Sequence, residues 1–476
     1  RLEDSSVKEF RLSDEISSLL DRVNVVLESY RHALTEGFSE SARYDFTIAL
    51  GKAGSEYRET IYNRSFSGKR SAVTRDALLG FLKLTTAYAD RSIDENARND
   101  GLYHSYNLVS FRDKRITIRR LYLMLEGQVA ALSSGYLDAG MSIQLLDALK
   151  SSALYRDDQQ SYMLYPFRQL PRFTEKNNIP AEELSRSELL KRMIAANDRS
   201  IISVDEAGGA HFNGSFRNEA MLSAALESLD REEYGKISEE DKDRILHLYE
   251  SVFDHQSFTG RSGTFYGYEG LGSIYWHMVS KLLVAVRETY EAAERNRSVK
   301  ELCDRIRDHY HAIKEGLGIH KSPALHGAFP VDAYSHTPAG AGAKQPGLTG
   351  QVKEDIISRF GELGVIVQNG RVAFIPSMLR TEELSESEEC FTYFDTDGKE
   401  NMIELAAGQM VFTLCQVPVI FSEGVRQEIT ICYANGGKRI IPGCVTDAET
   451  SQSIFSRSGE IRQVWFATDK LKINKR

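Results

Sequence analysis

The hydrophobic pattern of this chain changes its period once, after Gly361. Before that point apolar residues recur at intervals of three and four, which is the spacing of an amphipathic helix. After it, alternating apolar and polar runs are joined by Asn369-Gly370, Asp397-Gly398 and Asn435-Gly436. These pairs indicate tight hairpin turns, because both central residues of such turns need positive φ. The change predicts a helical domain over residues 1–360 and an antiparallel β-sandwich over residues 361–476.

Long helical patterns fill the first part of the chain. In "DEISSLLDRVNVVLESYRHAL", apolar residues such as Ile16, Leu20 and Leu27 share one face, and Ser13 or Asp14 can serve as the N-cap. We expect further helices over residues 42–62, 74–97, 116–133, 140–154, 185–196, 218–231, 239–255, 270–295 and 299–315. Their lengths and spacing suggest pairs of antiparallel helices.

One expected helix differs from the others. In "EGLGSIYWHMVSKLLVAV", Ile274, Met278 and Leu282 form one apolar face, while Val279 and Leu283 cover much of the other. A helix that is apolar nearly all round is buried on all sides. Buried helices ringed by amphipathic ones describe a double-layered barrel, so the predicted fold is mainly α: an (α/α)6-type barrel followed by a C-terminal antiparallel β-sandwich.

The charge of the chain excludes one class of partner. Over 476 residues the net charge is -9, and Lys and Arg do not form the basic face that nucleic acid requires. The nearest approach, "RDKRITIRR" at residues 112–120, is interpreted as the solvated start of a helix. With 41% hydrophobic and 27% charged residues, the composition is that of an ordinary soluble globular protein.

Metal and membrane sites are not expected either. The 5 cysteines show no CxxC spacing, so a thiolate metal site is not indicated. No apolar run approaches the roughly 20 residues that span a bilayer, so we expect no membrane partner. The chain begins "RLEDSSVKEF" without Met or a signal peptide, and we interpret it as a processed or truncated fragment, with a missing N-terminal domain left open. We expect a soluble protein, cytoplasmic or periplasmic.

Four stretches between expected helices are rich in residue types that bind sugars. Aromatic rings cover the apolar C–H surface of a pyranose, while carboxylates, amides and Arg bond to its hydroxyl groups. In an α/α barrel such loops gather at one mouth, so we expect an oligosaccharide or polysaccharide site there. The stretches are residues 100–108, 155–173 with Arg168, 264–278 with Tyr266, Tyr268, Trp276 and His277, and 328–356.

Glu269 is the first candidate for a catalytic acid. It precedes the buried helix among Tyr266, Tyr268 and Trp276, and desolvation by these rings would raise its pKa toward that of a proton donor. The alternative is a Glu in the first turn of a helix, which the helix dipole keeps ionised.

The stretch from 328 to 356 carries prolines, glycines and aromatic residues, which is unlike a solvated linker. His326 and His336 flank Asp332 and Tyr334 in the sequence. Their spacing matches no specific ligand pattern, so we expect hydrogen bonds to substrate or within the loop rather than a metal site.

The end of this stretch, "KQPGLTGQVKEDI", predicts an anion site. Gly347 and Gly350 permit a tight turn, and Thr349 can cap the helix that follows. The N–H groups at the start of that helix would bind phosphate or a sugar hydroxyl. The alternative is an ordinary capped helix that leads into the β-domain.

These features together resemble the cellobiose phosphorylase family and related inverting α/α-barrel glycosidases. In that family one carboxylic acid protonates the glycosidic oxygen, and inorganic phosphate is held by His, Gln and a Thr-Gly pair. The resemblance implies Glu269 as the acid and His336, Gln345, Thr349 and Gly350 as the phosphate site. The chain departs from the family in two respects. In the family the acid is an Asp in a Trp-Asn-Asp-Gly-like motif, which is not found in this sequence, and the family has an N-terminal β-sandwich that this sequence does not show.

The leading interpretation is a carbohydrate-active enzyme that cleaves glycosidic bonds by inverting phosphorolysis or inverting hydrolysis. We expect no cofactor, with inorganic phosphate as co-substrate of the first branch. The second branch needs another carboxylate to hold a water molecule, and Asp332 is the candidate. The alternatives are a non-catalytic carbohydrate-binding protein and a structural α/α scaffold. The expected substrate-binding residues also include His326, Tyr334 and Gln351.

Overall fold

The computed structural model describes residues 2–3, 6–169, 171–229, 231–235, 237–255, 272–317, 321–326, 336–337 and 351–469. It is about 47% helical with 22% strand, a mixture of helices and sheets with a C-terminal sheet. The chain divides into two units, Arg1–Met278 with His336–Lys344, and Val279–Ser335 with Gln345–Arg476. The predicted barrel, sandwich and domain limits stay predictions.

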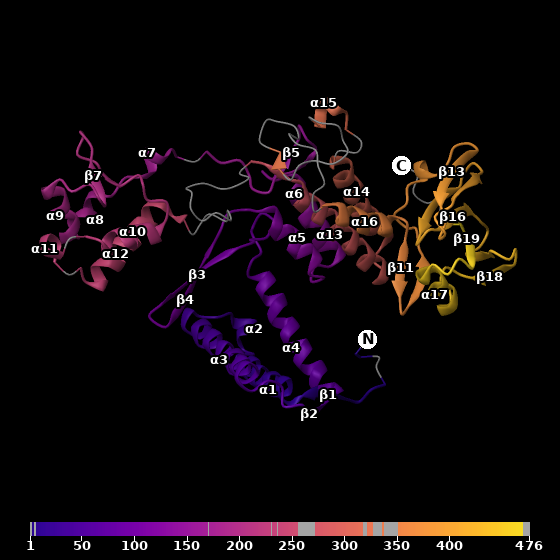
Figure 1. The fold of residues 1–476 in the computed structure, drawn as a ribbon, viewed down its shortest axis with the longest axis horizontal. Helices are drawn as coiled ribbons and strands as arrows, with labels where there is room; N and C mark the ends of the chain where they lie inside the picture. Colours follow the sequence, from indigo (N-terminus) through magenta and orange to yellow (C-terminus); the bar gives the residue numbers. More distant parts are fainter. Residues whose placement is uncertain are drawn as a thin grey trace. The chain divides into compact units, whose positions relative to one another are not determined.

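The first unit begins with a small helical group. Ser13, Ser39 and Thr74 cap α1, α3 and α4, each accepting a hydrogen bond from the backbone three residues on, and Ser13 is one of the predicted caps. The strands β1 and β2 pair in antiparallel fashion, and α1 lies beside α3 (Figure 1). The elements are β1 (Glu9–Ser13), α1 (Asp14–Ser29), α2 (Ala33–Glu36), α3 (Glu40–Arg64), β2 (Arg70–Thr74) and α4 (Arg75–Asp94).

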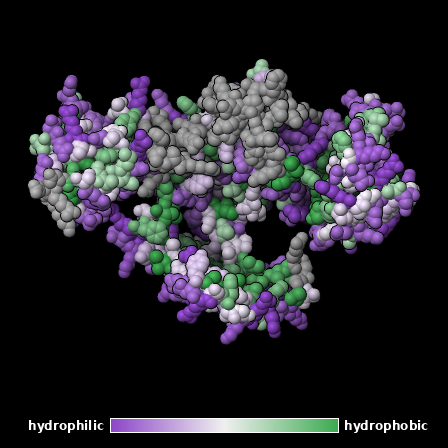
Figure 2. All heavy atoms as spheres, viewed as in Figure 1, coloured by the Kyte–Doolittle hydropathy of each residue, from purple (hydrophilic) through white to green (hydrophobic). Residues whose placement is uncertain are grey.

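These helices bury few apolar side chains. Val25 and Tyr62 are 64% and 81% exposed, and in α3 the described residues include one buried side chain, that of Ala53. Apolar residues therefore lie among the polar ones on the surface of this group (Figure 2). A barrel helix would bury a continuous apolar face, so these helices do not support that part of the prediction.

The helix expected over residues 116–133 is wrong in its first part. Residues 107–120 form a hairpin of β3 (Asn107–Arg112) and β4 (Arg115–Arg120), and α5 (Leu125–Ser133) begins later. The turn residues Asp113 and Lys114 have φ of 48° and 56°, the conformation of a tight hairpin. Ile116 and Ile118 alternate with polar residues, and this period of two together with β-branching favours a strand. The Arg-rich stretch is therefore a strand, not the start of a helix.

After α5 come α6 (Ala139–Lys150), β5 (Tyr155–Arg156) and β6 (Ser161–Tyr162), and then a group that we call the 171–255 module. The helices expected over 185–196, 218–231 and 239–255 are present as α9, α10 and α12. They pack around a core of their own, which includes Leu222, Tyr249 and Phe253. The module comprises α7 (Phe173–Lys176), α8 (Ala181–Ser185), α9 (Glu188–Ala196), β7 (Ile202–Val204), β8 (Ala210–Phe212), α10 (Glu219–Glu227), α11 (Arg231–Tyr234) and α12 (Glu239–Phe253).

The buried helix expected over residues 270–295 is present from Trp276 as α13 (Trp276–Arg295), but its first part is wrong, because Ile274 and Tyr275 form a strand. Val279, Leu282, Leu283 and Val286 are all buried, so apolar residues on both sides of the helix are covered. The second unit continues with α14 (Lys300–Gly316), α15 (Pro323–His326) and α16 (Gln351–Glu362). Among the described residues, no helix is long and apolar enough to cross a membrane.

The C-terminal β-structure begins at Val365, with two residues between it and the end of α16. Gly364 has a φ of 64°, and a Cβ at this position would lie 2.0 Å from the carbonyl carbon of Ile375, so a side chain is excluded there. The predicted hairpin at Asn369-Gly370 is confirmed, because β11 (Val365–Gln368) pairs with β12 (Arg371–Phe374). Hairpins are also present at Asp397-Gly398 and Asn435-Gly436, between β13 (Glu389–Phe394) and β14 (Glu400–Leu405) and between β17 (Glu428–Tyr433) and β18 (Lys438–Pro442). Their turns are longer than the predicted two residues, and of each pair the glycine alone has positive φ.

The C-terminal sheet has the strand order β15-β16-β19-β17-β18. Within it β16 and β19 are parallel, whereas the other pairs are antiparallel. Phe374, Phe421 and Phe466 meet in its core. All five cysteines are free. The remaining elements are β15 (Met410–Leu414), β16 (Val417–Glu423), α17 (Ala448–Ser456), β19 (Ile461–Thr468) and the short helix η2 (Thr381–Glu383).

Candidate functional site

Backbone hydrogen bonds join three of the four aromatic stretches. The Leu164 amide donates to the Ser273 carbonyl at 2.9 Å, and the Gly272 amide donates to the Tyr165 carbonyl at 3.3 Å. Gly272 and Ser273 are followed by β9 (Ile274–Tyr275), which pairs with β10 (His336–Thr337). The backbones of residues 164–165, 272–275 and 336–337 therefore lie together in the first unit.

The helix α5 connects the fourth stretch to this arrangement. The Leu125 amide donates to the Leu164 carbonyl at 3.0 Å. The buried Gln128 side chain accepts a hydrogen bond from the Tyr103 amide at 2.9 Å and donates to the Tyr103 carbonyl at 2.8 Å. A Cβ on Gly127 would lie 3.0 Å from the Tyr103 carbonyl oxygen, so glycine allows this close approach. Hydrogen bonds to α5 thus hold residues 103 and 164, and further backbone bonds link residue 164 to 273 and residues 274–275 to 336–337.

A pocket of about 240 Å³ lies beside α5. Asn96 and His104 shape its wall: the His104 amide donates to the Asn96 carbonyl at 2.8 Å, and His104 Nδ1 lies 3.3 Å from the Leu121 carbonyl oxygen. Burial and the charge of Arg98 lower the pKa of His104, so its imidazole is neutral at pH 7. The lining offers hydroxyl, amide and imidazole groups: Ser92, Ile93, Asn96, Tyr103, His104, Ser105, Gly127, Ala130 and Ala131.

Most of the surface that this lining presents is apolar. The volume is also below the roughly 300–1,000 Å³ of sites for drug-sized ligands, so this pocket by itself does not indicate a sugar site. In the described part of the chain, no group of three or more His, Cys, Asp and Glu side chains could hold a metal ion.

Of the predicted substrate-binding residues, Arg168, Trp276 and His277 have described side chains. The Arg168 guanidinium lies 3.4 Å from the centroid of the Tyr122 ring, a cation–π contact. Trp276 is 1% exposed, so its ring offers no open face to solvent. The Tyr275 hydroxyl and His277 Nδ1 are 3.4 Å apart.

The other predicted site residues are not described in full. For His326, His336 and Gln351 the structure gives the backbone, in α15, β10 and α16, and the side chains lie outside the described part. The remaining ones, whose positions all lie outside the described residues, are Tyr266, Tyr268, Glu269, Asp332, Tyr334, Gln345, Thr349 and Gly350.

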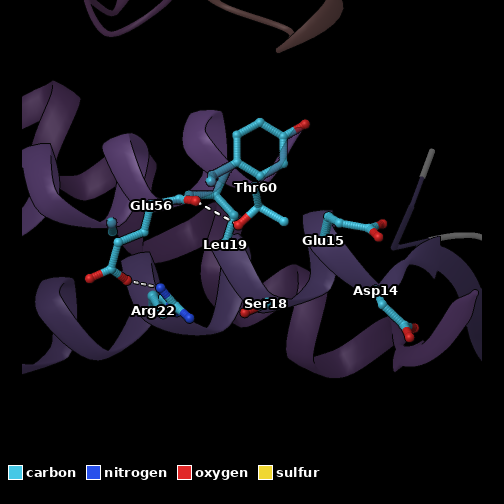
Figure 3. Close-up of a pocket in the computed structure, with 9 residues that line it drawn as sticks. Asp14, Glu15, Ser18, Leu19, Arg22, Glu56 and Thr60 are labelled. Atoms are coloured by element: carbon cyan, nitrogen blue, oxygen red, sulfur yellow. Dashed lines mark hydrogen bonds and ion pairs between the residues drawn. The ribbon is translucent and has the colours of Figure 1, made fainter. Parts of the chain in front are cut away.

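A second pocket, of about 260 Å³, lies in the helical group at the start of the chain (Figure 3). Its polar groups bond largely within the group: Arg22 pairs with Glu56, and Thr60 Oγ1 donates to the Glu56 carbonyl at 2.8 Å. None of the predicted site residues lines it. The lining comprises Asp14, Glu15, Ser18, Leu19, Arg22, Ala53, Glu56, Tyr57 and Thr60.

A family model matches part of the chain. Residues 170–256 match the model described as GH149 phosphorylase insertion domain 2. The match supports a glycoside phosphorylase family, GH149. It does not reach the finer likeness to cellobiose phosphorylase. No curated protein matches the chain.

The matched range coincides with the 171–255 module, and it explains why that module has its own core. In the GH149 model this segment is an insertion, and here the module lies between Tyr165 and Gly272, which are joined by a backbone hydrogen bond. Its three longest helices, α9, α10 and α12, were predicted from their period, whereas the short α7, α8 and α11 were not. Their membership of a separate core was not, because a helical period does not say which helices pack together.

Sequence reasoning also missed Tyr122, Gln128 and the wall of the pocket beside α5. Gln128 gave a usable signal, since it is a polar residue within the apolar run "LEGQVAALS" and follows a glycine. A buried polar side chain in a helix usually bonds to a neighbouring segment. Tyr122 gave none, because its contact with Arg168 joins residues far apart in the chain.

Proposed function

We propose that this protein is an inverting glycoside phosphorylase that acts on oligosaccharides or polysaccharides. The match of residues 170–256 to a phosphorylase insertion domain carries the proposal. The hydrogen bonds that link residues 103, 164–165, 272–275 and 336–337 support it, because they connect parts of the four stretches rich in sugar-binding residue types.

The proposed acid is Glu269. Its carboxylic acid gives a proton to the glycosidic oxygen while the bond from that oxygen to the anomeric carbon breaks. An oxygen of inorganic phosphate attacks the anomeric carbon from the opposite face and forms the new bond. The products are a glycosyl 1-phosphate of inverted configuration and a shortened sugar with a new hydroxyl group. Phosphate is the nucleophile, so a second protein carboxylate such as Asp332 is not needed to hold water.

We assign phosphate binding to His336, Gln345, Thr349 and Gly350, the residues implied by the family resemblance. An N–H group at a helix N-terminus suits an anion, and α16 begins at Gln351, directly after Gly350.

The remaining predicted residues would contact the sugar. The Arg168 guanidinium lies over the Tyr122 ring, and this contact orients it. Trp276 is buried, so in this proposal it supports the start of α13 rather than stacking on a sugar ring. The other proposed contacts are Tyr266, Tyr268, His277, His326, Tyr334 and Gln351.

The test is phosphorus NMR of the protein incubated with a panel of α- and β-linked oligosaccharides, with and without inorganic phosphate. We expect a glycosyl 1-phosphate signal of inverted anomeric configuration, and sugar release that requires phosphate. Equal sugar release without phosphate would eliminate the phosphorylase and favour hydrolysis with Asp332 as the base.

The acid is tested separately. Glu269→Gln should lower turnover by a factor on the order of 10² or more, because the amide cannot protonate the leaving oxygen. Asp332→Asn is the matched control and should retain phosphorolysis. Unchanged turnover in the Glu269→Gln protein would remove Glu269 from the mechanism.

A further inference from the structure

His211 lies between two oxygen atoms in the 171–255 module. It is the middle residue of β8. Its Nδ1 lies 2.5 Å from the Asn177 carbonyl oxygen, and its Nε2 lies 3.1 Å from Asp205 Oδ2. The first contact reaches the segment that follows α7, and the second reaches the turn between β7 and β8. The imidazole therefore connects β8 to two other parts of the module.

Both oxygen atoms belong to groups that are already bonded in place. The buried Asn177 side chain donates to the Phe212 carbonyl at 2.8 Å and accepts from the Phe212 amide at 2.9 Å. Asp205 Oδ1 accepts from the amides of Ala207 at 2.9 Å and Gly209 at 2.7 Å. Moving either group away from the imidazole would disturb these bonds, so both oxygen atoms keep facing the ring.

This arrangement needs a proton on each nitrogen of the His211 ring. A backbone carbonyl oxygen and an ionised carboxylate accept hydrogen bonds and cannot donate them. A neutral imidazole has one N–H group, so its second nitrogen would direct a lone pair at an oxygen atom. The protonated ring donates from both nitrogens. The geometry is therefore complementary to the imidazolium ion and not to the neutral ring.

The electrostatic surroundings of His211 favour the same ion. The hydrogen bond to the Asn177 carbonyl raises the pKa of His211; burial opposes this effect, and Asp205 adds to it. In return His211, followed by the Gly209 amide, lowers the pKa of Asp205. Ser203, which pairs with His211 across the hairpin, is uncharged. In the described part of the module, Asp205 is thus the charged side chain that lies against the imidazole.

We propose that His211 is a proton-dependent contact that closes the β7–β8 turn of the 171–255 module, so that the turn loosens when the ring loses its proton. The bond to Asp205 is the one that opens. The other side of β8 is held by further bonds, from the Asn177 side chain and from the Ile179 amide to the Ala210 carbonyl at 2.8 Å. The inference concerns the module alone and does not depend on the proposed function.

The direction of the pH effect follows from the raised pKa. The stability that this contact contributes is fully present below pH 6.5, the ordinary pKa of histidine, and is lost as the pH rises through the raised pKa of the folded protein. The His211 side chain is 22% exposed, so its proton can exchange with solvent while the module stays folded. The turn should therefore loosen in basic solution without unfolding of the module.

The first test is an NMR titration of the whole chain with isotope-labelled histidine. His211→Gln identifies the His211 signal among those of the 11 histidines, because that signal disappears. We expect its titration midpoint to lie above 6.5 and to fall in Asp205→Asn. Asparagine keeps an oxygen that can accept from the Ala207 and Gly209 amides, so this variant removes the charge and leaves the turn bonds. A midpoint at or below 6.5 in the unsubstituted protein would overturn the proposal.

The second test is hydrogen exchange of the amides of residues 205–209, corrected for the pH dependence of exchange in a free chain. Protection should fall as the pH rises through the His211 midpoint in the unsubstituted protein, and it should stay level in His211→Gln. His247→Gln is the matched control, because it replaces an exposed histidine on α12 of the same module, and it should keep the fall. A fall that persists in His211→Gln, or that is absent from the unsubstituted protein, would show that His211 does not control the turn.

Discussion

Arg119 donates two hydrogen bonds to the carboxylate of Asp254, from Nη2 to Oδ1 at 2.6 Å and from Nη1 to Oδ2 at 3.2 Å. Arg119 belongs to β4, and Asp254 directly follows α12. Three residues after Arg119, Tyr122 lies under the Arg168 guanidinium. One short stretch of chain therefore contacts both the segment before the 171–255 module and the last residues of the module itself.

The Arg119–Asp254 pair is expected to restrain the end of that module. Arg119 is 56% exposed, so the coupling between the two side chains should be only about 0.5–1 kcal/mol and should decrease with salt. Hydrogen exchange at the last turn of α12 in Arg119→Gln, Asp254→Asn and the double variant gives this coupling. If the effects of the two single substitutions simply add in the double variant, the pair contributes nothing to stability.

Two helical glycines should respond oppositely to alanine. Gly127→Ala should destabilise the protein by about 1–3 kcal/mol, because its Cβ would lie 3.0 Å from the Tyr103 carbonyl oxygen. Gly51→Ala should stabilise α3 by about 0.5–1 kcal/mol, since nothing lies within 4 Å of the new Cβ and alanine favours a helix. Thermal unfolding measures both. A stabilised Gly127→Ala protein would show that α5 does not approach residue 103 closely.

His311 should make the protein sensitive to acid. Burial and the charge of Arg380 lower its pKa from 6.5 to about 3, with Lys314 and Arg307 adding to the effect and Glu362 opposing it. Neither ring nitrogen of His311 has a hydrogen-bond partner within the described residues. In the unfolded chain His311 is protonated at pH values below its ordinary pKa of 6.5. In the folded protein it stays neutral until the pH falls to about 3.

The stability from His311 is therefore fully present above pH 6.5 and is lost as the pH falls from 6.5 toward 3. The loss should approach about 1.4 kcal/mol per pH unit within that window. Urea unfolding between pH 7 and 4 should show a shallower decline for His311→Leu than for the unsubstituted protein. His309→Gln, on the same helix, is the control. Parallel curves for His311→Leu and the unsubstituted protein would contradict a neutral buried imidazole.

The 171–255 module should fold as a separate fragment, because its buried residues form one core. Circular dichroism of the fragment should show helix and a cooperative thermal transition. Phe212→Ala should abolish that transition, since Phe212 is 1% exposed and loss of a buried Phe side chain costs about 3–5 kcal/mol. A fragment without cooperative unfolding would mean that the module depends on the rest of the chain.

Local chemistry was enough to predict many of the elements. Ser13 caps α1, the apolar period of α13 matches its burial, and Asn369-Gly370 forms its turn. The β3–β4 hairpin was missed because charged residues around Ile116 obscured its period of two. The parallel pairing of β16 with β19 could not be predicted, since it joins strands separated by β17, β18 and α17.

For the candidate site, residue types predicted which stretches come together, but not the individual contacts. Trp276 was expected at a sugar-binding surface and is in the core instead. The period of the helix places Trp276 on one side but does not say whether that side faces a cavity or a neighbouring helix. Arg168 was expected among the sugar-binding residues, and its guanidinium lies over the ring of Tyr122.

The hydrogen bonds of Leu164 with Ser273 and of Gly272 with Tyr165 have a consequence for the order of folding. Their partners are roughly a hundred positions apart, and the entropy lost on closing a loop grows with the length of flexible chain. If the 171–255 module folds first, most of that length is already compact when the strands meet. We therefore expect amides of the module to gain protection from hydrogen exchange during refolding before the amides of Leu164 and Gly272. Folding would then proceed from the middle of the segment between residues 165 and 272 toward its two ends.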